Sequence, residues 1–185
     1  MCKRKVVSQL SLGLLLAALA FAMSAVCGAQ TSKDSNQFSA ILADIKTEAL
    51  QLRHDAEDLK TFTHNSHLTW ESHAQKVTEI KDHVNEAGKL LAKLDSARGS
   101  ASLWQQEAFD HIVPMMKELA SSVEATIEHF DQRPGLLRTG PYVEFADANY
   151  ELASNSAEVI SDYVEYGKSK AKSDELAAKL AVPEN

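Results

Sequence analysis

The chain has 185 residues and is acidic, with 19 Lys and Arg against 26 Asp and Glu and a formal net charge of −7. This length suits one domain with its own core, and the negative charge argues against nucleic acids and anionic lipid headgroups as partners. The chain's long apolar run lies near the N-terminus, so we expect no later segment to span a membrane.

Residues 1–29 have the pattern of a cleaved signal peptide. Three basic residues at positions 3–5 precede the apolar run LGLLLAALAFAM, which is short for a membrane anchor and is followed by small residues. We expect cleavage after Ala29, with Ser24 and Gly28 as alternative last residues. The predicted location is therefore the periplasm or the exterior, and residues 30–185 form a single domain.

Export would also change the composition of the chain. Loss of the three basic residues takes the net charge from −7 to −10, and both cysteines, Cys2 and Cys27, leave with the segment. The mature chain then has no disulfide, thiolate nucleophile or zinc–sulfur site. A lipid anchor on Cys27 is not expected, because Ser24 and Val26 match a lipoprotein cleavage box poorly.

Residues 34–63 are predicted to form the first helix. Asp34 and Gln37 have the spacing of a capping box, which places the helix start there. Apolar residues then recur every seven positions, as expected for one buried stripe. This stripe contains Phe38, Ile45, Leu52 and Leu59.

A second helix is predicted for residues 69–95. Thr69 is the expected N-cap, and Glu71 lies in the first turn, where the helix dipole favours a negative charge. Trp70 opens a core stripe as a packing plug, and His73 is the one polar member of the parallel stripe. The segment SARGSAS, residues 96–102, ends the helix with a small, polar turn.

The third predicted helix spans residues 103–131 and starts with a capping box of Ser102 and Gln105. The link DQRPGLLRTGP that follows is the clearest helix break in the chain. Within the helix, the heptad stripe consists of Phe109, Met116, Val123 and Phe130.

The fourth predicted helix covers residues 141–172, with Pro141 in its first turn. Its core face is made of small side chains such as Ala146 and Ala153, which favours close packing, although a ligand cavity is the alternative. The tail from about residue 173 either extends the helix or frays.

Four helices of similar length with short first and second connections predict an all-α, up-down-up-down antiparallel four-helix bundle. In architecture alone this resembles exported bundles such as cytochrome c′. The chain has no C-x-x-C-H motif for covalent haem attachment, so no family function is carried over.

The stretch THNSHLTWESH holds three of the seven histidines. In an up-down bundle its His64, His67 and His73 come to the same end as His129, so these four are the candidate metal ligands. The alternative is that the exposed positions are merely polar. For His73, the alternative is a half-buried residue bonded to Tyr142 or Asn149.

Two other metal arrangements are less favoured. His111 and Met115 could ligate haem iron or copper, but the heptad frame places them on the flanks of the third helix and points Pro114 outward. A di-metal site of the ferritin type needs Glu-x-x-His motifs, and no histidine of this chain has a glutamate three positions before it. We therefore predict no cofactor, with a divalent transition metal or haem b as the alternative.

The chain also lacks a glycine-rich phosphate loop and a nucleophile elbow, so we do not expect an enzyme. The leading hypothesis is an exported, non-catalytic binding or scaffolding module of the cell envelope with a protein partner. The alternative is a four-helix bundle that binds a metal or, non-covalently, haem.

Overall fold

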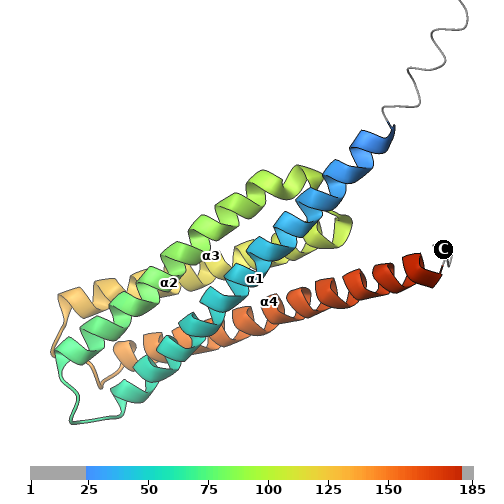
Figure 1. Ribbon diagram of the computed structural model, residues 1–185. Coiled ribbons are helices and arrows are strands. Elements are labelled where there is room, and N and C mark those ends of the chain that lie inside the picture. Colours follow the sequence, from blue (N-terminus) through green and yellow to red (C-terminus); the bar gives the residue numbers. More distant parts are fainter. Residues whose placement is uncertain (1–23, 181–185) are drawn as a thin grey trace, which may run out of the picture.

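The computed structural model describes the backbone of residues 24–180 and the side chains of residues 36–180. Most of the predicted signal peptide and the side chain of Cys27 lie outside these residues. The elements are α1 (Ser24–Thr63), α2 (Trp70–Ala97), a short 3₁₀ turn η1 (Arg98–Ser100), α3 (Leu103–Gln132) and α4 (Pro141–Leu180). Successive helices run antiparallel, and α1 packs along α4 to close the ring (Figure 1). The predicted four-helix bundle is confirmed.

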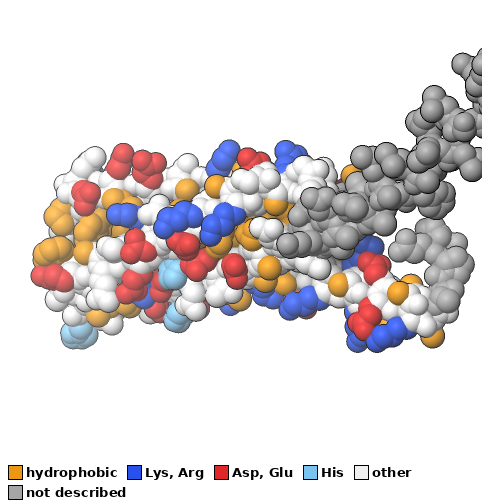
Figure 2. All heavy atoms as spheres, turned by 45° about the horizontal axis from the view of Figure 1, so that its top comes forward, with side chains coloured by type: hydrophobic (Ala, Val, Ile, Leu, Met, Phe, Trp, Pro, Cys, Tyr) orange, Lys and Arg blue, Asp and Glu red, His pale blue; other side chains and the backbone are white. Residues whose placement is uncertain are grey.

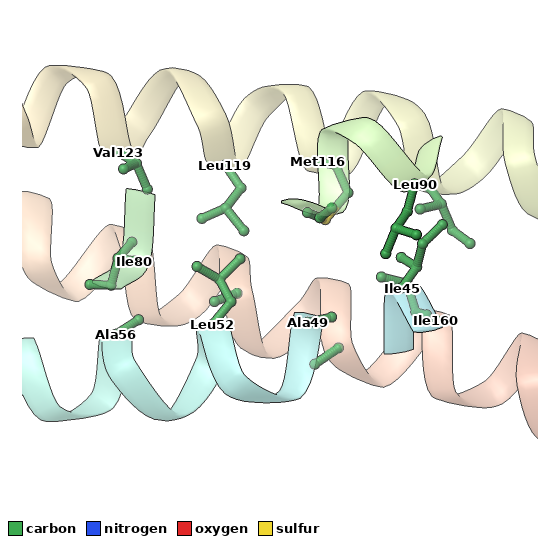
Figure 3. Close-up of a cluster of buried hydrophobic side chains, with 14 of the residues drawn as sticks. Ile45, Ala49, Leu52, Ala56, Ile80, Leu90, Met116, Leu119, Val123 and Ile160 are labelled. Carbon is green, nitrogen blue, oxygen red and sulfur yellow. The ribbon is translucent and has the colours of Figure 1, made fainter. Parts of the chain in front are cut away.

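The helices pack through the predicted heptad positions. Figure 3 shows Leu52 of α1 and Leu119 of α3 pointing toward each other, with Ile80 of α2 and Val123 of α3 in the adjoining layer. Each fully buried leucine or isoleucine stabilises the fold by about 1.5–3 kcal/mol. The stripe of α1 is sealed completely, since no member is more than 1% exposed: Phe38, Ile45, Leu52 and Leu59.

Two of the three predicted N-caps are confirmed. Thr69 is the N-cap of α2, and at α3 the backbone N–H of Ser102 donates to Oε1 of Gln105 at 3.0 Å. The predicted start at Asp34 is wrong, because α1 begins at Ser24. A capping box satisfies free N–H groups at a helix end, but it does not interrupt a helix whose preceding residues can continue it.

The connection between α3 and α4 contains the predicted helix break. Helix α3 ends at Gln132, and Pro141 is the first residue of α4, where its missing N–H costs nothing. Gly140, just before it, has a φ of +43°, a backbone conformation that glycine adopts without steric strain.

The small-residue face of α4 packs closely, as predicted. Ala146, Ala153 and Ala157 are buried, and the contact between α1 and α4 is the most extensive in the bundle. The tail extends this helix, because α4 continues to Leu180, although its side chains beyond Gly167 are almost all exposed. The last turns of α4 are therefore helical without being part of the core.

A cluster of charged side chains joins α1 to α2. The ammonium of Lys76 lies 2.9 Å from Oδ1 of Asp55, 3.1 Å from Oδ2 of Asp58 and 2.6 Å from Oε2 of Glu79. His83 places its Nδ1 2.7 Å from Oε2 of Glu48. Burial lowers the pKa of Lys76, but the hydrogen bonds to the carboxylates outweigh it and hold the pKa well above its usual value.

On the part of the bundle that Figure 2 shows uncovered, acidic and basic side chains are intermixed. Within residues 24–180, no helix combines the length and the hydrophobicity needed to cross a membrane. Most apolar side chains of the described residues therefore point toward the core of the bundle.

Candidate functional site

His73 is fully buried at the end of the bundle that carries the connections 64–69 and 133–140. Its Nδ1 lies 3.2 Å from the hydroxyl oxygen of Tyr142, which is also fully buried. The ring of Phe62 packs edge-on against the imidazole, with 5.7 Å between ring centroids. The alternative to metal binding, a histidine bonded to Tyr142, is confirmed, although the side chain is fully buried rather than half-buried.

Tyr142 also contacts the second interior histidine. The ring of His129 stacks on that of Tyr142 with centroids 6.2 Å apart, and Phe145 lies 5.6 Å from the same imidazole. Nε2 of His73 and Nε2 of His129 are both buried without a hydrogen-bond partner among the described residues. One phenol ring thus lies against both imidazoles, which come from α2 and α3.

The pair formed by His73 and Tyr142 is neutral. Burial, and secondarily the charge of Arg138, lower the pKa of His73. Burial raises the pKa of Tyr142 well above its usual range. Because both groups are sealed from solvent, they cannot contact a substrate while this end of the bundle stays closed.

Asn149, the other predicted partner of His73, bonds elsewhere. Its Nδ2 donates to Oγ1 of Thr126 at 2.7 Å, and that hydroxyl donates to the carbonyl oxygen of Ser122 at 2.9 Å. The bond between Asn149 and Thr126 fixes α4 to α3 about two turns from Tyr142 along α4, so it supports the packing of the aromatic layer rather than its chemistry.

The other two candidate metal ligands lie on the surface. His64 and His67 are exposed in the connection between α1 and α2, whereas His73 is sealed in the core and His129 is partly buried. Among the described residues, no group of three or more His, Cys, Asp or Glu side chains is placed to hold a metal ion. The four histidines therefore lie at the same end of the bundle but differ in how deeply they are buried.

His111 and Met115 lie on the flank of α3, as the heptad frame predicts, and Pro114 is exposed. Nδ1 of His111 is 2.6 Å from the hydroxyl oxygen of Tyr163 on α4. The hydrogen bond gives this histidine a partner across the α3–α4 interface.

The outer surface of the same end is apolar in part. Trp70 is 53% exposed and Leu136 is 47% exposed, and a hollow of about 450 Å³ is lined by both, together with Leu68 and Arg138. We call Leu68, Trp70, Leu136 and Arg138 the tip surface. Hydrophobic side chains gather at this end of the molecule, on the left in Figure 2. The expectation that Trp70 plugs the core is wrong, because its side chain is half exposed and borders the hollow.

The tip surface is held by hydrogen bonds between the two connections. Nη2 of Arg138 donates to the carbonyl oxygens of Ser66 at 2.9 Å and Leu68 at 3.3 Å. Buried Leu137 anchors the second connection. The hollow is therefore formed by both connections, which these hydrogen bonds hold together.

Charge within the two connections is opposite in sign to that of the whole chain, while exposed Glu71, Asp131 and Glu144 flank them at the helix ends. The connections 64–69 and 133–140 contain Arg133 and Arg138 and no acidic residue, whereas the chain carries −7. Our sequence-based predictions missed Leu136 and Arg138. The segment RPGLLRTG, with two arginines and two leucines between helices, holds the signal that could have identified them.

Comparisons of the chain with protein-family models, with curated proteins and with solved structures find no match. The fold places the protein in the class of antiparallel four-helix bundles.

Proposed function

We propose that the protein is an exported, non-catalytic binding module of the cell envelope, and that the tip surface contacts a partner protein. The observation that carries this proposal is the half-exposed Trp70 beside the half-exposed Leu136 around one hollow. Tryptophan and arginine are the residues most enriched among those that dominate binding energy at protein interfaces. Trp70 and Leu136 side by side at one end of the bundle favour a contact with an apolar centre.

Charge gives the partner a further property. The two arginines of the connections favour a partner patch that places carboxylates opposite Arg133 and Arg138 around an apolar centre. A partner of this kind approaches the bundle end-on.

Site-specific cross-linking in the native envelope tests the proposal. A photoreactive residue at Leu136 should give one dominant adduct, whereas the same residue at exposed Glu151 in the middle of α4 should not. The protein captured at Leu136 is then purified, and its affinity is measured for the native chain and for a Trp70→Ala, Leu136→Ser variant.

We expect the double substitution to weaken binding at least tenfold, since removing an interface tryptophan commonly costs about 2 kcal/mol or more. Both side chains are half exposed, so the free energy of unfolding should change little. Equal adducts at positions 136 and 151, or an affinity that the double substitution leaves unchanged, would contradict the proposal.

A further inference from the structure

A second hollow lies between α3 and α4, on the side of the bundle rather than at its tip. It has a volume of about 500 Å³ and is lined by Trp104, Glu107 and His111 from α3 and by Asp162, Tyr163 and Tyr166 from α4. The α3 residues are three and four positions apart, and on α4 Tyr166 lies four positions after Asp162 and three after Tyr163, so each set occupies one side of its helix. Two faces thus flank one cleft, which we call the α3–α4 cleft.

Aromatic rings form much of its wall. The rings of Trp104 and Tyr166 meet edge to face with centroids 5.4 Å apart, and Tyr166 is 53% exposed. The ring of Tyr163 is held by the 2.6 Å hydrogen bond between its hydroxyl and Nδ1 of His111. Three electron-rich rings are therefore fixed at the cleft while remaining accessible from solvent.

Gly167 sets the position of the indole. A Cβ atom at this position would lie 2.7 Å from Cη2 of Trp104, closer than non-bonded atoms approach. The Trp104 ring therefore rests against the backbone of α4 only because residue 167 has no side chain. Gly167 occupies the same heptad position of α4 as Ala146, Ala153 and Ile160, which precede it in the helix.

The charge of the cleft is uncompensated. Its lining includes the carboxylates of Glu107 and Asp162 and no lysine or arginine. Neither carboxylate makes an ion pair with a described residue, in contrast to nearby Glu165, which pairs with Lys46 and Lys168. Burial raises the pKa of Tyr163, and the negative charge of Glu107 raises it further. The rings thus lie in a negative potential.

We propose that the α3–α4 cleft binds a compact organic cation with a methylated ammonium group. Such cations are weakly hydrated and are attracted to the faces of tryptophan and tyrosine, and two unpaired carboxylates add attraction of the same sign. A metal ion would instead need several oxygen or nitrogen ligands at about 2 Å, and the described residues form no such group. This site is separate from the tip surface and goes beyond the proposed function.

Fluorescence provides the assay. The chain has two tryptophans, so Trp70→Phe leaves Trp104 as the single indole reporter in the cleft. Titration with tetramethylammonium or choline should change its emission with a Kd of about 0.1–1 mM, as expected for a few half-exposed cation–π and charge contacts. The neutral isostere of choline, 3,3-dimethylbutan-1-ol, should bind at least tenfold more weakly.

Charge variants separate the cleft from the general acidity of the surface. Glu107→Gln with Asp162→Asn should weaken choline binding about three- to tenfold. The matched control, Glu118→Gln with Glu151→Gln, removes the same charge from exposed positions of the same helices and should leave the Kd unchanged. An equal effect of the two pairs would mean nonspecific attraction and would overturn the proposal.

Gly167→Ala tests the geometry. The added methyl group should displace the end of the Trp104 ring and weaken binding several-fold, while the chain stays folded because alanine favours a helix. Thermal unfolding by circular dichroism checks the fold. A Kd that is the same in this variant would contradict the role of the indole.

The source of the ammonium group is distinguished by comparing free choline with a peptide that carries one trimethylated lysine. Tighter binding of either supports the proposal and identifies a free or a chain-borne cation. Failure of both to bind, with the native fold intact, would overturn it.

Discussion

At the scale of single residues, His73 is a titratable group enclosed by Phe62 and Tyr142, and among the described residues no carboxylate is hydrogen-bonded to its ring. Burial lowers the pKa of His73, and the positive charge of Arg138 lowers it further. In the unfolded chain the same imidazole takes up a proton near its ordinary pKa of 6.5. The folded state therefore holds fewer protons than the unfolded state below that pH.

The sign of the pH effect follows from this difference. We expect His73 to leave stability unaffected above about pH 7 and to reduce the free energy of unfolding as the pH falls below 6.5, by at most about 1.4 kcal/mol per pH unit. The loss stops growing once the pH is below the lowered pKa of the folded state. Urea unfolding between pH 7.5 and 5 measures it.

Substitution separates His73 from the other histidines. His73→Gln should flatten the decrease, because glutamine does not titrate, whereas the exposed control His67→Gln should keep the native slope. If the His73→Gln chain shows the same slope as the native chain, the histidine is not the origin of the effect, whatever the stability of the variant at pH 7.5.

Between elements, the contact of α1 with α2 depends on a charge cluster as well as on the heptad stripes. Asp55 is 7% exposed and its carboxylate is held by Lys76, whose own side chain is mostly buried. Nε2 of His83 also lies 3.3 Å from Oδ2 of Asp55, so removing Lys76 leaves this carboxylate with the imidazole as its remaining described partner in a medium of low dielectric constant.

Lys76→Met should therefore lower the free energy of unfolding by about 2 kcal/mol, a value reduced from that of fully buried pairs because Asp58 and Glu79 are partly exposed. The control is Lys89→Met, which breaks the exposed pair with Glu86 on the same helix and should give no measurable change. Chemical denaturation at pH 7 measures both. A decrease of equal size in the two variants would refute the special role of Lys76.

The heptad pattern was enough to predict the four helices and the inward direction of His73, because burial of apolar residues fixes the rotation of each helix. It did not predict the exposure of Trp70, since periodicity within α2 says nothing about whether a loop covers its first turn. Nor did it predict that Asp55 would meet Lys76, because the contact depends on the relative shift of two helices. The tip surface and the α3–α4 cleft were missed for the same reason.

At the scale of the whole molecule, export is the property that the sequence predicts outside the described residues. If residues 1–29 are removed, the protein isolated from the envelope or the medium should begin at Gln30 and carry no cysteine. Cell fractionation followed by intact-mass measurement and N-terminal sequencing tests this. An intact chain that begins at Met1 inside the cell would contradict export, and a lipid on Cys27 would contradict the expected cleavage site.

The arrangement of the helices gives the molecule two unlike poles. The N-terminal end of α1 and the C-terminal end of α4 project from one pole, and the connections that form the tip surface lie at the other (Figure 1). After removal of residues 1–29, the 34 residues of α1 that remain, 30–63, are about 51 Å long at 1.5 Å each. A chain fixed to a support through either end would therefore present Trp70 and Leu136 outward, beyond the layer of lipid headgroups or resin at its base.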